Sequence, residues 1–229
     1  MTKVGFVFDD GFRTSCLEVA RLFEARQLRA NFAVLAEPDT FMPDTEKGDF
    51  SLWNELQARG HVIHPHGYDH TDLSSIPFRD ATAKIDACMS CFAEKLRGFD
   101  ATKCIYHTTY NRTTPEIDSY LLSRVLAIRT MGPLGLPGSG FNDFAQLNTR
   151  KLGCSWHGPE PCDEHLWEGL LRAEQHQPTL FLYMLHGLNN EGWGPVRART
   201  LERVLDYISG SMVMSYTELT QECTEFTKN

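Results

Sequence analysis

Short apolar runs alternate along the chain with longer segments in which apolar residues recur every three or four positions. The short runs have the length of β-strands, and the longer segments have the period of a helix with one buried face. Because this alternation is typical of parallel strands joined by helices, the sequence predicts an α/β fold. The expected strands cover residues 4–8, 30–36, 61–64, 103–107, 125–131, a stretch within 145–154, 179–186 and 211–215.

The expected helices lie between these strands, and two of them carry recognisable end signals. Ser51 is placed to cap a helix over residues 51–60, and Gly60 to end it. A threonine followed by Pro115 begins a helix over residues 113–125. The other expected helices cover residues 15–27, 78–98, 163–176 and 196–209, and proline-rich and glycine-rich loops are expected at 37–50 and 132–143.

About seven or eight strand–helix units follow one another without an internal repeat or a linker, so we expect one domain spanning residues 1–229. This succession predicts a barrel-like sheet with its helices outside. In such folds the functional groups lie at the carboxyl ends of the strands.

The charge and hydropathy of the chain exclude two classes of partner. The formal net charge is −8, and no basic run exceeds two residues, which argues against binding of a nucleic acid backbone. The chain does not open like a signal peptide, and no segment approaches the roughly 18 apolar residues that span a bilayer. We therefore expect a cytoplasmic protein without a membrane partner.

Seven cysteines are scattered along the chain, and this odd number favours buried thiols in a reducing compartment over a disulfide framework. Cys88 and Cys91 form a CxxC pair within the expected helix 78–98, on its apolar face. We interpret this pair as part of the core, because a thioredoxin-type pair would lie at a helix start, directly after a strand.

Acidic and imidazole side chains gather at the ends of the expected strands. The segment FDDG, residues 8–11, places Asp9 and Asp10 at the end of the first strand. Neighbouring carboxylates on an extended backbone point in different directions, so one can face a metal ion while the other faces a substrate. The alternative is a simple Asp-Gly turn. The same position relative to a strand is shared by His66, His70, His107 and His186.

The segment HPHGYDH, residues 64–70, offers the best metal ligands. His66 and His70 are four residues apart, a spacing that brings two imidazoles to one side of a turn. A carboxylate from another strand would complete a site with open positions for water, as in catalytic zinc sites. His64 shares a strand face with His66, and we interpret it as a buried histidine rather than a ligand.

In this order and separation, these motifs resemble those of the polysaccharide deacetylases that share the NodB homology fold, also called carbohydrate esterase family 4. The family's first motif, T/S-F-D-D-G, is similar to VFDDG, with Val7 in place of the hydroxyl residue. Its second motif, H-[ST]-x-x-H, is similar to HGYDH, with Gly67 at the second position. Near the end, MLHG at residues 184–187 and the helix and strand expected over 204–219 are also similar, so the likeness covers nearly the whole chain.

The resemblance implies a distorted (β/α)7–8 barrel and a role for each matching residue. Asp10, His66 and His70 would bind a divalent metal ion, most simply zinc, with cobalt and nickel as alternatives. Asp9 would be the general base and His186 the general acid. These roles suit the chemistry, because a metal-bound water loses a proton near neutral pH and a leaving amine needs one.

The third and fourth family motifs differ in this chain. At YHTTYN, residues 106–111, His107 occupies the place of the family's arginine, and Tyr110 that of the aromatic residue whose backbone amide holds the oxyanion. Arg129, at the end of the next expected strand, could replace the missing arginine or form an ordinary surface ion pair. The family's Asp-Trp motif is not found. Asp143 and Asp163 are candidates by location, and Trp156 and Trp193 could stack on a sugar or plug loops to the core.

Taken with the resemblance, the sequence favours a hydrolase that removes an acyl group, most simply acetyl, from an amino sugar or a related small acylated amine. Two alternatives stay open: hydrolysis of another non-peptide C–N bond, of the deformylase or cyclic-amide type, and a carbohydrate-binding relative without catalysis. The acyl group, the length of the substrate and the oligomeric state are not determined by the sequence.

Overall fold

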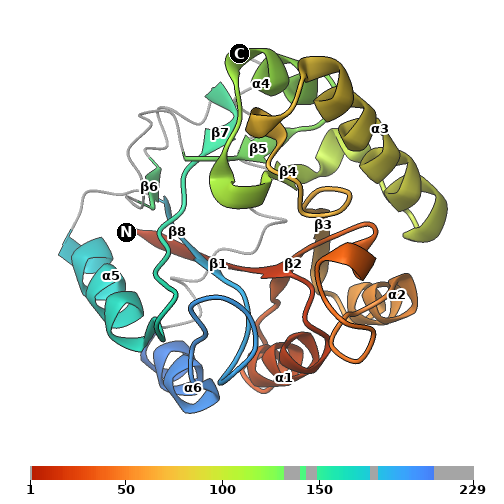
Figure 1. The fold of residues 1–229 in the computed structure, drawn as a ribbon. Coiled ribbons are helices and arrows are strands. Elements are labelled where there is room, and N and C mark those ends of the chain that lie inside the picture. The colour runs from red at the N-terminus through yellow and green to blue at the C-terminus, as the bar shows by residue number, and fades with distance from the viewer. Residues whose placement is uncertain (1, 132–139, 143–148, 176–179, 209–229) are drawn as a thin grey trace.

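The computed structural model describes residues 2–131, 140–142, 149–175 and 180–208 (Figure 1). Its strands form a five-stranded sheet in the order β3-β2-β1-β8-β6 and a three-stranded sheet in the order β4-β5-β7. Adjacent strands run parallel except β6, which pairs antiparallel with β8. The strands are β1 (Lys3–Asp10), β2 (Asn31–Val34), β3 (Val62–Pro65), β4 (Ile105–His107), β5 (Ala127–Arg129), β6 (Phe141–Asn142), β7 (Lys151–Leu152) and β8 (Leu180–Leu185).

The helices lie outside the strands, as the alternating pattern predicts. In Figure 1, α5, α6, α1 and α2 follow one another around the larger sheet, and α3 and α4 cover the smaller one. The α-helices are α1 (Arg13–Glu24), α2 (Phe50–Ala58), α3 (Phe78–Lys95), α4 (Pro115–Leu122), α5 (Asp163–Gln175) and α6 (Ala198–Tyr207), and short 3-10 turns occupy Pro38–Thr40, Leu73–Ser75, Ala101–Lys103 and Thr109–Asn111. None of the described helices combines the length and apolar character that crossing a bilayer requires.

The two sheets meet along edges where side chains supply part of the bonding. Between β3 and β4, the backbone N–H of Ile105 donates to Nδ1 of His64 at 3.3 Å. On the opposite side, Ser155 bridges to Tyr183, and the amide side chain of Asn142 bonds the backbone of Gly153. The α/β prediction with a distorted, barrel-like sheet is therefore confirmed.

Apolar side chains form one layer on each face of the strands, because successive side chains along a strand point to opposite faces. Phe6 and Phe8 of β1 point toward the helices and meet Phe23 of α1 edge to face. Val7, between them, points to the interior of the barrel, where it packs in a smaller cluster that includes Ala33. The side chain at position 9 therefore belongs to the interior face.

Several local expectations hold and others need correction. Thr114 caps α4 by accepting a hydrogen bond from Ile117 N–H, and Pro115 begins that helix. The cap of α2 is Asp49, not Ser51, and it accepts a 2.9 Å bond from Leu52 N–H.

The segment 132–143, expected to be a loop, contains β6, because pairing with β8 overrides its glycine-rich composition. Of the described cysteines, all are buried and unpaired, including the CxxC pair in α3. The strand expected at 211–215 lies outside the described residues.

His61 connects the starts of β2 and β3 in its neutral form. The backbone N–H of Ala30 donates to Nδ1 of His61 at 3.0 Å, and its Nε2 lies 3.0 Å from a carboxylate oxygen of Glu24. Nδ1 can accept this bond only while it carries no proton. Burial lowers the pKa of His61, although Glu24 partly opposes the effect.

We expect this histidine to destabilise the protein in acid. Because its pKa is lower in the folded than in the unfolded chain, the unfolded chain binds more protons below the ordinary histidine pKa of about 6.5. The stability advantage of the wild type over His61→Gln should therefore be constant above about pH 7 and shrink below about 6.5, by at most about 1.4 kcal/mol per pH unit. Urea unfolding of both proteins from pH 8 to 5 measures it. An advantage that stays constant down to pH 5 would show that His61 does not titrate differently on folding.

Candidate active site

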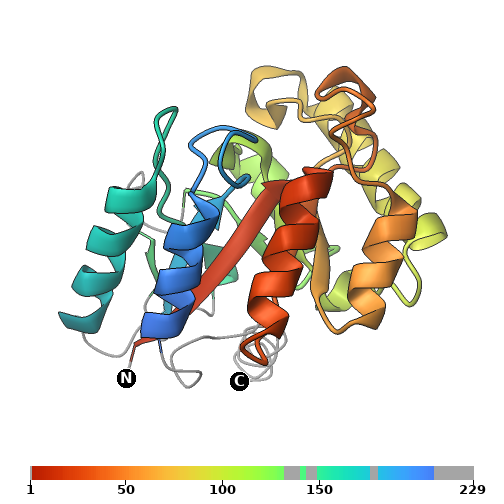
Figure 2. The same ribbon diagram turned by 90° about the horizontal axis from the view of Figure 1, so that it is seen from below.

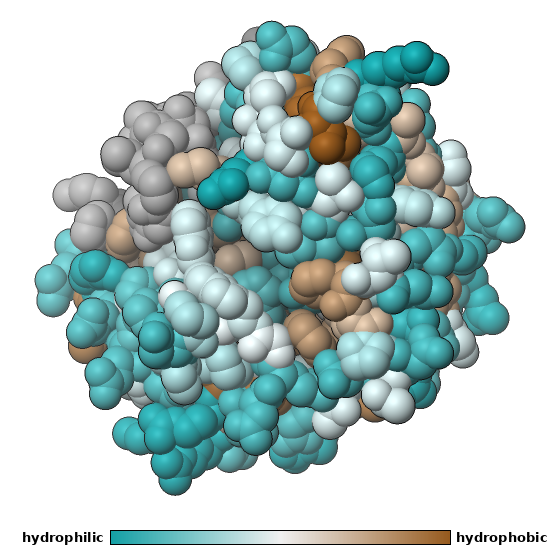
Figure 3. Space-filling view, in the orientation of Figure 1, coloured by the Kyte–Doolittle hydropathy of each residue, from teal (hydrophilic) through white to brown (hydrophobic). Residues whose placement is uncertain are grey.

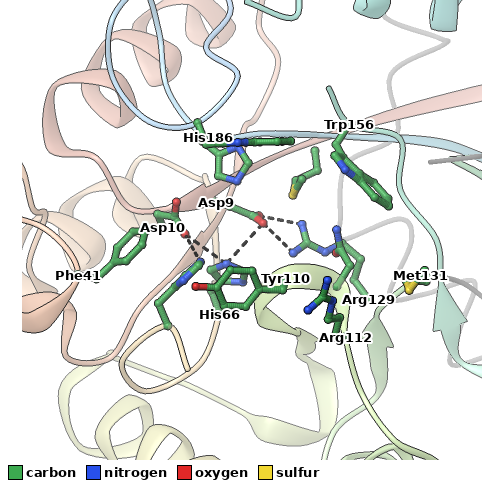
Figure 4. A pocket seen from close by; sticks show the side chains of 14 residues that line it. Asp9, Asp10, Phe41, His66, Tyr110, Arg112, Arg129, Met131, Trp156 and His186 are labelled. Atoms are coloured by element: carbon green, nitrogen blue, oxygen red, sulfur yellow. Dashed lines mark hydrogen bonds and ion pairs between the residues drawn. The ribbon is translucent and has the colours of Figure 1, made fainter. Parts of the chain in front are cut away.

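The loops that follow the strands rise at one end of the molecule, and the polar strand-end residues gather there. In Figure 2, β1 runs from the N-terminus at the bottom toward the end where the loop after β8 (blue) and the loop 153–162 (teal) extend. Figure 4 shows Asp9, Asp10, His66 and His186 around one pocket at this end.

Asp9 and Asp10 point to different partners, as expected of neighbours in a strand. Asp9 follows Val7 onto the interior face of the barrel. The backbone of Asp10 has a φ of 72°, in the left-handed region, which takes its side chain out of the strand alternation. Both aspartates are buried: Asp9 is 1% exposed and Asp10 is 4% exposed. The two acids therefore occupy different environments within one site.

Arg129 holds Asp9 by two hydrogen bonds. Its Nη1 and Nη2 donate to the two carboxylate oxygens at 2.8 and 2.7 Å. Arg129 is fully buried, so the alternative of a surface ion pair does not apply. Arg129 on β5 lies opposite His107 on the neighbouring strand β4. A forked guanidinium from β5 thus orients Asp9, from the strand next to the one that carries His107.

Asp10 faces His66 and His70, and the three groups fit a divalent metal ion. Nε2 of each imidazole lies 3.3 Å from Oδ1 of Asp10, and the three ligand atoms are all within 4.8 Å of one another. Oδ1 is buried and accepts no hydrogen bond in spite of these neighbours. Separations near 3.3 Å are what tetrahedral bonds of about 2.1 Å to a common ion would give. The donor set and its geometry therefore suit zinc or a related ion.

Neighbouring groups fix the orientation of both imidazoles. Nδ1 of His66 donates to the backbone carbonyl of His107 at 3.0 Å, and its Nε2 is directed at Asp10. The ring of His70 stacks on Phe41, with centroids 4.1 Å apart, and meets Tyr110 at 4.7 Å. The turn between the histidines passes through Gly67, whose φ of 107° is a conformation that residues with a Cβ adopt only with strain.

The electrostatics keep Asp10 ionised. Burial alone would raise the pKa of this carboxyl, but the imidazoles of His66 and His70, together with the nearby His186, outweigh that effect. The pKa of Asp10 is consequently held well below its usual value. An ionised carboxylate beside two imidazole nitrogens is what a divalent cation needs.

His186 follows β8 and lines the same pocket. In Figure 4 its ring and that of Tyr110 lie on opposite sides of the Asp9 carboxylate. Burial lowers the pKa of His186, and the carboxylates of Asp10 and Asp9 oppose this shift. The indole of Trp193 meets the imidazole edge to face, with centroids 5.5 Å apart.

The pocket has a volume of about 610 Å³, enough for a sugar ring, and most of its wall is apolar. Figure 3 shows apolar side chains beside a hollow near the middle of this face, within a largely hydrophilic surface. Tyr110, Trp193 and Phe41 are 55%, 42% and 39% exposed, so their rings are open to a ligand. Sequence reasoning pointed to Tyr110, Trp156 and Trp193, but it missed Phe41, Asn111, Arg112, Met131 and Met184, which also line the pocket.

Strained backbone is concentrated at this pocket. Seven non-glycine residues among those described have a positive φ, and four of them line the pocket: Asp10, His70, Tyr110 and Asn111. Such conformations cost of order 1–3 kcal/mol each and are retained where the surrounding structure requires them, often at functional sites.

Other candidates from the sequence lie elsewhere. The side chain of His107 is fully buried, is not part of the pocket wall, and has its ring 5.4 Å from that of His64. Burial and the nearby Arg129 lower the pKa of His107 well below its usual value. Asp163 accepts a bond from Arg197 beside a separate hollow that also contains His157. Asp143 is outside the described residues.

Comparisons with solved structures show that the fold is shared with carbohydrate-active esterases and deacetylases. A family 4 carbohydrate esterase from Streptomyces lividans, solved with acetate, has a TM-score of 0.60 and 14% identity over 93% of this chain and 91% of that one. A family 4 acetyl xylan esterase from Clostridium thermocellum, solved with a cobalt ion, gives 0.60 and 14% over 96% and 91%. A peptidoglycan deacetylase from Bacillus subtilis gives 0.57 and 13% over 99% and 95%.

Comparison with known sequences identifies the family directly. No curated protein matches the chain at a significant level. The family model described as polysaccharide deacetylase matches residues 2–120, just over half of the 229 residues, and this segment contains Asp9, Asp10, His66 and His70. The chain belongs to the polysaccharide deacetylase family.

Proposed function

We propose that this protein is a metal-dependent hydrolase that removes an N-acyl group, most simply acetyl, from an amino sugar or a related carbohydrate. The observation that carries the proposal is that two adjacent carboxylates have different partners within one pocket. Asp10 faces two imidazoles, Asp9 is held by Arg129, and both open into one pocket with His186. Zinc is our first choice of metal, since one carboxylate and two imidazoles suit it.

Asp10, His66 and His70 would hold the ion. Bound there, a divalent ion would lower the pKa of a coordinated water and polarise the carbonyl of the substrate. Asp9 does not belong to this ligand set, but its Oδ2 is only 3.6 Å from Nε2 of His66. This closeness supports our assignment of Asp9 as the general base, which would take a proton from a water next to the metal site.

Arg129, His186 and the backbone of Tyr110 have the remaining roles in the proposed reaction. The two bonds from Arg129 leave Asp9 with one defined orientation and stabilise its charge in a buried setting. His186, across the carboxylate, gives its proton to the leaving nitrogen, which would otherwise depart as an unstable amide anion. The backbone N–H of Tyr110 is the donor that we assign to the developing oxyanion.

The pocket wall suits a carbohydrate. Exposed rings such as those of Trp193 and Tyr110 stack on the apolar face of a sugar while its hydroxyl groups remain hydrated. Membership of the polysaccharide deacetylase family supports the same substrate class. Two of the similar structures were solved with acetate and with cobalt, respectively, which agrees with acetyl transfer to water at a metal site in this fold.

The direct test is acetate release from N-acetylglucosamine and its short oligomers. We expect zinc-loaded protein to release acetate, chelation to abolish release, and added zinc to restore it. Asp9→Asn should lower the rate by about 100- to 10,000-fold, the usual contribution of a general base. Equal release by Asp9→Asn and wild type would reject Asp9 as the base.

The same assay separates the alternatives. A panel of formylated amines and cyclic amides, with the same dependence on metal and on Asp9, would reveal hydrolysis of another C–N bond. Stoichiometric metal binding without turnover of any acylated amine would indicate a carbohydrate-binding relative and overturn the proposal.

A further inference from the structure

The loop that follows His186 is tied to the first turn of α1 by Glu191 and Ser15. Oε2 of Glu191 accepts hydrogen bonds from the backbone N–H and the hydroxyl of Ser15, at 2.9 and 2.5 Å. The hydroxyl oxygen in turn accepts from Leu188 N–H at 2.8 Å, and Glu191 N–H donates to the carbonyl of Leu188 at 3.0 Å. These four bonds form one cluster, which we call the Glu191–Ser15 clamp.

The start of α1 has a specific need for this carboxylate. Its N-cap residue, Phe12, makes no side-chain cap bond, and its first turn contains no acidic residue. The N–H of Arg13 donates to the carbonyl of Glu46, so the N–H of Ser15 and the positive end of the helix dipole are open to an acceptor from another part of the chain. Ser15 is only 3% exposed, so the carboxylate bonds it in a setting where such charge-assisted bonds are strong.

Both sides of the clamp adjoin groups of the proposed reaction. On one side, α1 begins three residues after Asp10. On the other, Leu188 comes two residues after His186, and both strand ends are adjacent because β1 and β8 pair in parallel up to Phe8 and Leu185. The clamp thus joins the loop that follows His186 to the start of α1, the segment that follows Asp9 and Asp10. Figures 1 and 2 show these two segments side by side.

The residues that follow Glu191 lie against His186. The next residue, Gly192, has a φ of 74°, and a Cβ at this position would lie 2.9 Å from both the His186 Cβ and the Phe12 ring. Trp193 then places its indole against the imidazole. The loop therefore packs closely against His186 at Gly192 and Trp193.

We propose that Glu191 and Ser15 are positioning residues that hold His186 within proton-transfer distance of the leaving nitrogen. The inference rests on the proposed function, in which His186 is the general acid. It predicts a defect that depends on the leaving group, because a nitrogen must be protonated as it leaves and a nitrophenolate need not be.

The test compares an N-acetyl amino sugar with 4-nitrophenyl acetate, using the zinc-loaded full chain. Glu191→Ala and Ser15→Ala should lower kcat for the amide by about 10- to 100-fold, as for a catalytic group displaced by about 1 Å, and leave the ester rate within about twofold. Glu191→Gln retains an acceptor oxygen and should recover most of the amide rate. The double variant Glu191→Ala/Ser15→Ala should be no slower than Glu191→Ala, because both changes break one cluster.

Two controls separate this inference from the proposed function. His186→Ala must itself slow the amide more than the ester; if it does not, the assignment of the acid fails. Asp49→Ala removes a comparable side-chain bond at the start of α2 and should lower thermal stability without changing the ratio of amide to ester rates. If His186→Ala shows the leaving-group dependence but Glu191→Ala slows both substrates equally, or slows neither, the positioning role is overturned.

Discussion

Replacing Arg129 with methionine is expected to reduce kcat for deacetylation by about 100-fold or more and to destabilise the fold by about 3–5 kcal/mol. Both effects have one origin. The change leaves the carboxylate of Asp9 buried, charged and without the two bonds that orient it. Steady-state kinetics with saturating metal and urea unfolding measure the two effects. Arg129→Lys keeps the charge but not the fork, so its kcat should lie between those of the wild type and the methionine variant.

Two further variants identify the cause of the loss. Arg59 also makes two bonds to one carboxylate, that of Glu24, but their side chains are 32% and 31% exposed. Arg59→Met should therefore cost no more than about 1 kcal/mol and leave kcat unchanged. The double change Asp9→Asn/Arg129→Met should regain much of the lost stability without regaining activity. Full activity of Arg129→Met would show that Asp9 needs no orienting partner.

The second large effect is expected at the metal ligands. Asp10→Asn removes the one negative charge from the set formed with His66 and His70. We expect metal affinity to fall by at least about 100-fold and acetate release to fall with it. Asp9→Asn should also lose activity, but its metal affinity should stay within a few fold of the wild type, because its carboxylate is bonded to Arg129 instead. Activity measured over a range of zinc concentrations distinguishes the two, because excess zinc should rescue Asp10→Asn in part and Asp9→Asn not at all.

Much of the fold could be predicted because its determinants are local. The apolar period of each segment and caps such as Thr114 are written in short stretches of sequence. The approach of Asp10 to His66 and His70 also follows from local facts, since parallel strands end at one edge. The cap of α2 was misplaced by two residues because Asp49 and Ser51 are both good cap residues, and only the backbone geometry selects between them.

The partner of Asp9 depends on information that no short stretch contains. His107 and Arg129 are opposite each other on β4 and β5, and the bonds to Asp9 come from Arg129, whose side chain is the longer of the two and permanently charged. Phe41 was missed for a related reason: it follows a short 3-10 turn in an irregular loop and meets His70 only in the folded chain. Glu191 likewise meets Ser15 across 176 positions.

The proposed mechanism requires that Asp10, His66 and His70 bind one metal ion and that Asp9 beside them does not coordinate it. Calorimetric titration of metal-stripped protein with zinc, checked by elemental analysis of the loaded protein, measures this directly. We expect one tightly bound ion per chain in the wild type and in Asp9→Asn, and affinity weaker by about 100-fold or more in Asp10→Asn. A wild type that binds no ion, or an Asp10→Asn variant that binds zinc as tightly as the wild type, would contradict the account.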